Sequence, residues 1–115
     1  MEELNLLECC SPMAREPLGE PEAAALARAF KALGDPVRLR IISIVASHGG
    51  GEACVCDLTA SFEVGQPTIS HHLKVLKDAG LLTSERRASW VYYRVVPDRL
   101  AQLSALLHLP AEVAQ

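Results

Sequence analysis

The residues of this chain best suited to chemistry are its four cysteines, which fall into two pairs. Cys9 and Cys10 are adjacent, whereas Cys54 and Cys56 are separated by one valine. Soft thiolates select thiophilic ions such as As(III), Sb(III), Cd(II), Pb(II), Cu(I) and Zn(II). In a reducing cytosol we therefore expect ligands or reactive thiols at these positions rather than structural disulfides.

Helical geometry limits what Cys54 and Cys56 can do together. A short helix is expected over residues 55–62, and side chains two positions apart on a helix point to roughly opposite sides. Both sulfurs can reach one ion only if Cys54 lies outside that helix. Otherwise one of the two thiols is a small buried apolar side chain, a common fate for cysteine. The adjacent thiols of Cys9 and Cys10 can converge on one ion with little strain.

A helix predicted over residues 66–79, ended by Gly80, has the features of a DNA reader. Ile69, Leu73 and Leu76 form its apolar stripe. The polar side chains off this stripe are Gln66, Thr68, Ser70, His71 and Lys74. Such side chains near a helix N-terminus can enter the major groove and bond base edges, while the lysine suits a phosphate. The alternative is a solvated helix, because helix-turn-helix geometry also occurs without DNA.

Residues 81–96 are predicted to form a β-hairpin with a charged tip. Arg86 and Arg87 at this tip would follow the DNA backbone or the minor groove. The net charge of the chain is −3, but residues 66–99 carry six basic side chains against three acidic ones. Residues 1–22 carry six glutamates against one arginine. Because local field steers nucleic-acid association, the basic segment favours DNA binding.

The remaining elements complete a mainly α fold with a β-hairpin wing, a winged helix-turn-helix. Helices are expected over residues 22–33 and 36–47, the second with Asp35 as N-cap and largely buried, and from Pro97 onward. The predicted organisation is an irregular cysteine-bearing arm over 1–20, a DNA-binding and dimerisation domain over 21–109, and a tail over 110–115.

A chain of 115 residues makes at most one domain, and domains this small often gain stability by dimerising. No apolar run approaches a membrane span, and the acidic N-terminus does not have the pattern of a secretory signal. We therefore expect a cytoplasmic protein without a membrane partner. Enzymatic function and an organic cofactor are not expected, because no catalytic constellation or phosphate loop is recognisable.

Three segments in this order resemble the ArsR/SmtB family of bacterial metalloregulatory repressors: residues 30–41, 54–58 and 66–76. The resemblance covers roughly residues 22–108. It implies a homodimer whose terminal helices form the interface. It also implies a repressor that leaves double-stranded operator DNA when a metal or metalloid binds. The Cys-Val-Cys-Asp-Leu segment at 54–58 is similar to the thiolate site of As(III) and Cd(II)/Pb(II) sensors.

Within this family the adjacent arm cysteines favour the arsenic-responsive form. The prototype arsenic repressor has a third cysteine soon after the Cys-Val-Cys-Asp-Leu segment, but here Thr59, Ala60 and Ser61 stand in that region. The resemblance therefore implies that the arm supplies the missing sulfurs. Because As(III) takes three thiolates, the expected ligands are Cys9 and Cys10 with Cys56 or Cys54, and Sb(III) is an equivalent inducer.

Two alternatives remain open at the sequence level. In the first, Cd(II) or Pb(II) is the inducer and all four sulfurs bind it. In the second, the cysteines form a disulfide under oxidant and the protein is a redox-sensing repressor. A zinc site in the last helix is not favoured. Zinc-sensing members of the family often have an Asp/His pair there, but here Leu100 rather than a histidine stands two residues after Asp98. His48 and His108 are expected to be ordinary surface residues.

Overall fold

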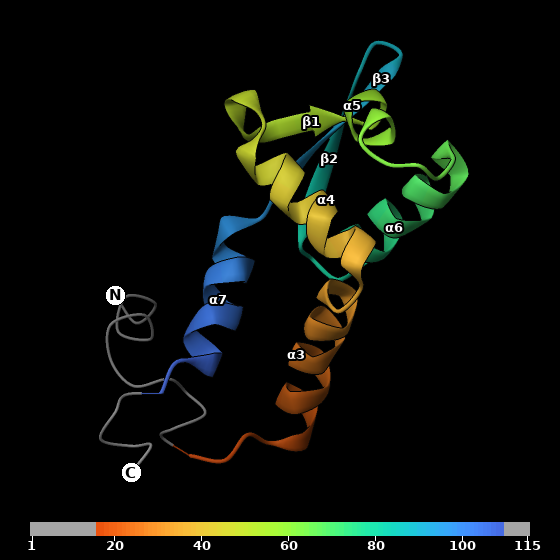
Figure 1. The fold of residues 1–115 in the computed structure, drawn as a ribbon. Helices are drawn as coiled ribbons and strands as arrows, with labels where there is room; N and C mark the ends of the chain where they lie inside the picture. The colour runs from red at the N-terminus through yellow and green to blue at the C-terminus, as the bar shows by residue number, and fades with distance from the viewer. Residues whose placement is uncertain (1–15, 110–115) are drawn as a thin grey trace. The chain divides into compact units, whose positions relative to one another are not determined.

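The computed structural model of this chain describes residues 16–109. This part divides into two compact units, one of residues 28–96 and the other of residues 16–27 with 97–109. Cys9 and Cys10, the rest of the predicted arm before residue 16, and the tail 110–115 lie outside the described residues. The first helix of the described residues, α3, runs over Glu20–Leu33 and begins two residues earlier than expected (Figure 1).

Helix α4 spans Pro36–Ser47, as predicted. Asp35 begins it, because its Oδ2 accepts the backbone N–H groups of Val37 at 2.9 Å and Arg38 at 3.1 Å. The expected burial of this helix is only partly right. Its buried stripe consists of residues at helical spacing, namely Ile41, Ile42 and Val45. Leu39 lies off that stripe and is 55% exposed.

A three-stranded antiparallel sheet contains the two strands of the wing hairpin and one further strand. Strand β1 covers Glu52–Cys54, β2 covers Leu82–Arg87 and β3 covers Trp90–Val95, in the order β1-β3-β2 (Figure 1). Strand β1 was not predicted; it has three residues and follows a short 3-10 turn at Gly49–Gly51. Three residues are too few for the alternation by which a strand is recognised.

The charged residues expected at the hairpin tip belong instead to strand β2. Arg86 pairs with Val91 and Arg87 with Trp90, so only Ala88 and Ser89 form the turn. Ala88 takes φ 57°, as two-residue hairpin turns require. Neighbouring residues of a strand face opposite sides, so the two arginines of the wing are separated by the sheet.

The helix-turn-helix consists of α5, Val55–Ala60, and α6, Gln66–Asp78. Gly80 ends α6 with φ 80°, and hydrogen bonds from Gly80 to Lys77 and from Leu81 to Leu76 close the last turn as predicted. The fully buried side chains of these helices include Leu58, Ile69, Leu73 and Leu76. This core fixes which side of α6 remains exposed.

The last helix, α7, spans Pro97–Leu107 and belongs to the second unit. Leu103 and Leu106 are buried, as its amphipathic pattern predicted, whereas Leu107 is 60% exposed. Within the described residues, no helix is long and apolar enough to cross a membrane.

Candidate thiolate site and nucleic-acid interface

Cys54 lies where strand β1 ends and helix α5 begins. It is the last residue of the strand and the N-cap of the helix, with an extended backbone at φ −87° and ψ 164°. Its Sγ accepts the N–H of Asp57 at 3.4 Å, while Asp57 Oδ2 accepts the N–H of Cys54 at 3.2 Å. This reciprocal capping box fixes both side chains over the first turn. Cys54 therefore lies before the helix, the condition under which both sulfurs can meet.

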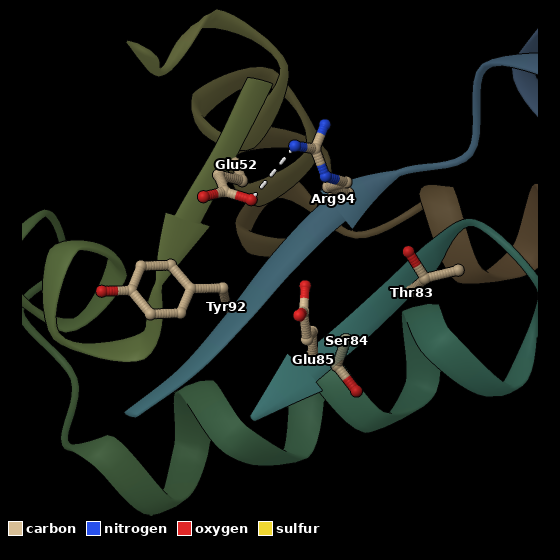
Figure 2. A pocket seen from close by; sticks show the side chains of 6 residues that line it. All are labelled: Glu52, Thr83, Ser84, Glu85, Tyr92 and Arg94. Carbon is tan, nitrogen blue, oxygen red and sulfur yellow. Dashed lines mark ion pairs between the residues drawn. The ribbon is translucent and has the colours of Figure 1, made fainter. Parts of the chain in front are cut away.

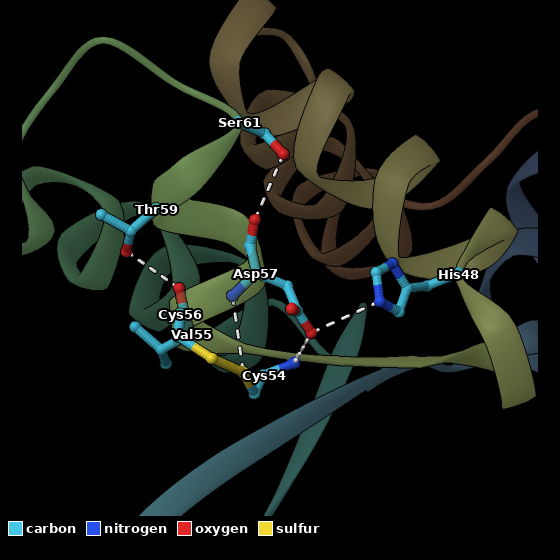
Figure 3. Close-up of a disulfide and its surroundings, with 7 residues drawn as sticks. All are labelled: His48, Cys54, Val55, Cys56, Asp57, Thr59 and Ser61. Atoms are coloured by element: carbon cyan, nitrogen blue, oxygen red, sulfur yellow. Dashed lines mark hydrogen bonds and ion pairs between the residues drawn. A yellow bond between two sulfur atoms is a disulfide. The ribbon is translucent and has the colours of Figure 1, made fainter.

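The structure joins Cys54 and Cys56 in a disulfide with a Cα–Cα distance of 5.3 Å (Figure 3). We expected ligands or reactive thiols here rather than a structural disulfide and, on a regular helix, sulfurs on opposite sides. That geometry does not apply, because the N-cap backbone of Cys54 is extended rather than helical. Cys54 is 5% exposed, whereas Cys56 is exposed, so solvent reaches the pair from the Cys56 side.

Asp57 and His48 complete the surroundings of the two sulfurs. One ligand atom each from Cys54, Cys56 and Asp57 lies within 4.8 Å of the others. His48 is exposed, as expected for a surface residue, and its Nε2 lies 3.3 Å from Asp57 Oδ2 (Figure 3). Asp57 could have been found from the capping-box spacing. The contact of His48 depends on the Gly49–Gly51 turn, which spacing does not reveal.

These donors suit a thiophilic ion once the disulfide is reduced. A cysteine ligates such an ion as its thiolate, and the two sulfurs are already close together. Two sulfurs are one short of the three that As(III) takes. The predicted further ligands, Cys9 and Cys10, lie outside the described residues, so their participation stays a prediction.

The residues predicted to read DNA on α6 are all exposed: Gln66, Thr68, Ser70, His71 and Lys74. Lys74 also forms a surface ion pair with Asp78 at 3.1 Å, so it is partly neutralised. The neighbouring His72 has a different position, because its Nδ1 lies 3.2 Å from Arg38 Nη1 on α4. His72 therefore helps to hold α6 against α4 and leaves His71 at the surface.

The two wing arginines differ in their partners. Arg87 donates from Nη1 to Glu52 Oε2 at 2.6 Å and from Nη2 to Glu52 Oε1 and Glu85 Oε1, both at 2.9 Å. Its guanidinium also lies 4.6 Å from the centre of the Tyr92 ring. Arg86 is exposed and has no ion pair among the described residues. Of the two predicted DNA contacts on the wing, only Arg86 has an unpaired charge.

Known proteins are similar to this chain in sequence and in fold. The sequence profile described as bacterial regulatory protein, arsR family, matches residues 35–84. An uncharacterized HTH-type transcriptional regulator of Methanocaldococcus jannaschii is 41% identical over 81 residues, 70% of this chain and 89% of the relative. The arsenical resistance operon repressor of Bacillus subtilis is 50% identical over 64 residues, 56% of this chain and 59% of that repressor.

A cadmium resistance transcriptional regulatory protein, a CadC homolog of Staphylococcus aureus, is 34% identical over 97 residues, 83% of this chain and 78% of the relative. A crystal structure described as a possible transcriptional regulator for arsenical resistance superposes with a TM-score of 0.63 at 38% identity, covering 69% of this chain and 79% of that chain. The chain belongs to the arsR family of DNA-binding transcriptional regulators, which are not enzymes.

Proposed function

We propose that the chain is a homodimeric, cytoplasmic transcriptional repressor that leaves its operator when As(III) or Sb(III) binds its cysteine thiolates. The observation that carries this proposal is the convergence of Cys54, Cys56 and Asp57 within 4.8 Å. Along the chain, only residues 58–65 separate this group from α6, whose polar side is exposed. Relatives named for arsenical and for cadmium resistance support an ion sensor and leave the ion to be decided.

The ligands in this proposal are Cys9 and Cys10 with Cys56 or Cys54. When bound, the ion supplies the bonds that hold these sulfurs together. The N–H of Asp57 already donates a hydrogen bond to Cys54 Sγ and holds this sulfur over the first turn of α5. Ligation then ties the N-terminal arm to α5 and biases the mobility of α6 on DNA. Couplings of this kind are typically about 1–3 kcal/mol, or roughly 5- to 150-fold in affinity.

Operator binding in the presence of ions tests the proposal. The reduced full chain is bound to a duplex that it selects from random DNA, and arsenite, antimonite, cadmium or lead is added. We expect stoichiometric arsenite or antimonite to release the DNA. Binding that persists through stoichiometric arsenite, while cadmium or lead releases it, would make the four-sulfur alternative correct.

Serine variants of the four cysteines identify the ligands, with bound ion read from thiolate absorbance. Serine is a good N-cap, so Cys54→Ser keeps the start of α5 while removing one sulfur. Cadmium sensing should suffer in this variant, because four sulfurs are required. Arsenite sensing should survive there if Cys56 is the third ligand and should be lost in Cys9→Ser and Cys10→Ser.

The Cys54–Cys56 disulfide favours a second candidate, a repressor that senses oxidant. Two thiols would lose two protons and two electrons to one peroxide molecule, which becomes two waters. Mass spectrometry of the chain after mild peroxide treatment tests this. A loss of two hydrogens located at residues 54–56, together with altered operator binding that a thiol reductant reverses, is the expected result. Unchanged operator binding by the oxidised chain would remove this candidate.

A further inference from the structure

Glu52 links the strand that ends in Cys54 to the wing. Both terminal nitrogens of Arg87 donate to its carboxylate, at 2.6 and 2.9 Å. A bidentate arginine–carboxylate pair fixes direction as well as distance. The Glu52 side chain is only 19% exposed, so solvent screens this pair less than an ordinary surface ion pair.

Strand β1 is short enough for its two ends to act together. Cys54 pairs in register with Tyr92, and Glu52 pairs with Arg94, so both ends contact strand β3. Arg94 Nη2 lies 3.2 Å from Glu52 Oε1 (Figure 2), and Arg87 covers the Tyr92 ring. Cys54 and Glu52 are therefore the two ends of one three-residue strand, and a displacement of Cys54 would also displace Glu52.

The charges around Glu52 explain why Arg87 is a poor candidate for a phosphate contact. Glu52 and Glu85 are matched by Arg87 and Arg94, so this face of the sheet has no net charge. Figure 2 shows Glu52, Glu85 and Arg94 around a shallow hollow on that face. Arg87 faces these carboxylates, whereas Arg86, on the other side of β2, has none of them as partners.

We infer that Glu52 is a positioning residue that couples the thiolate site to the wing through Arg87. Ion binding at Cys54, or at Cys56 two residues after the end of β1, would move β1, and the Glu52–Arg87 pair would carry that movement to the hairpin that flanks the DNA. The inference rests on the proposed function, since it takes an ion site and an operator as given.

The pair can be broken from either end. Glu52→Gln removes its carboxylate from β1, and Arg87→Gln removes its guanidinium from the wing. Glu85→Gln is the matched control, because Glu85 binds the same Arg87 Nη2 at 2.9 Å but belongs to the wing itself. It changes the charge by the same amount as Glu52→Gln and leaves the Glu52–Arg87 pair in place.

The measured quantity is the ratio of operator Kd values with and without ion, for the reduced full chain on its selected duplex. The probe is arsenite, or cadmium if arsenite does not release the wild type. We expect this ratio to fall toward one in Glu52→Gln and Arg87→Gln, and to stay within about twofold of wild type in Glu85→Gln. Thiolate absorbance should show that all three variants bind the ion like wild type. If Glu52→Gln does not fold, Arg87→Gln carries the test.

Glu52→Gln and Arg87→Gln variants that bind the ion normally and keep the wild-type ratio would overturn the coupling role and leave the proposed function intact. An equal loss of the ratio in Glu85→Gln would also overturn it, because charge rather than the link would then matter. A wild type that no thiophilic ion releases would instead contradict the proposed function, and the coupling role with it.

Discussion

Side chains of helix α6 and of strand β2 were both expected to contact DNA, but their burial and their ion pairs differ. On α6 the polar residues predicted to read DNA are exposed, while the apolar stripe is buried. On β2 both Arg86 and Arg87 are exposed. Arg86 has no ion pair among the described residues, whereas Arg87 binds two carboxylates. Residues predicted to have the same role, DNA contact, therefore have different surroundings on α6 and on β2.

The difference follows from what lies beside each element. A helix of 3.6-residue period separates a core side from a solvent side, so its polar residues remain at the surface. A strand places successive side chains on opposite faces, and one face of β2 is on the same side of the sheet as Glu52 of β1. The side of this helix on which a residue lies can thus be predicted from spacing, whereas the ion-pair partners of a wing residue depend on a neighbouring strand.

The largest expected effect tests the division of α6 into two sides. Leu73 is fully buried, so Leu73→Ala should lower the free energy of unfolding by about 2–5 kcal/mol. Its neighbour Lys74 is exposed, and Lys74→Ala should change stability by less than about 0.5 kcal/mol while weakening operator binding. Urea unfolding of both variants measures this. Equal destabilisation would mean that α6 is not divided in this way.

The next effect concerns base reading by α6. Gln66→Ala should cost about 1–3 kcal/mol in operator affinity if the amide bonds one base bidentately. Affinities for duplexes with single base substitutions provide the check, because the variant should lose its preference at one position only. A uniform loss across all duplexes would assign Gln66 to the phosphate backbone instead.

A smaller effect separates the two wing arginines. Each phosphate contact contributes about 0.9 to the slope of log affinity against log salt. Arg86→Gln should lower this slope by about that amount, whereas Arg87→Gln should leave it unchanged because Glu52 and Glu85 already neutralise Arg87. Operator titrations at several salt concentrations test both. A reduced slope in Arg87→Gln would remove the contrast between the two arginines.

The smallest effect concerns pH and the Glu52–Arg87 pair. Hydrogen bonds from Arg87 hold the pKa of Glu52 below its ordinary value of 4.5. The pair therefore stabilises the fold above about pH 4.5, and this stabilisation is lost as the pH falls through the lowered pKa. Unfolding of wild type and Glu52→Gln between pH 3 and 7 should show a steeper acid loss in the wild type. Parallel curves would mean that the pair adds nothing to stability.

The class of fold and the positions of the main helices could be predicted from the sequence alone. Asp35-Pro36 marked the start of α4, Gly80 marked the end of α6, and the apolar spacing of α6 predicted its buried stripe. These signals are local, since caps and helical periodicity depend on residues within a few positions of one another. The family resemblance rested on the same local segments.

The contacts between residues far apart in the sequence follow from the tertiary structure alone. Strand β1 exists because β3 pairs with it, and that pairing places Glu52 against Arg87, 35 positions later in the chain. The same strand leaves Cys54 extended, so its sulfur meets Cys56, while the turn after α4 brings His48 to Asp57. Spacing along a chain does not encode such contacts, because they depend on how separate elements pair in space.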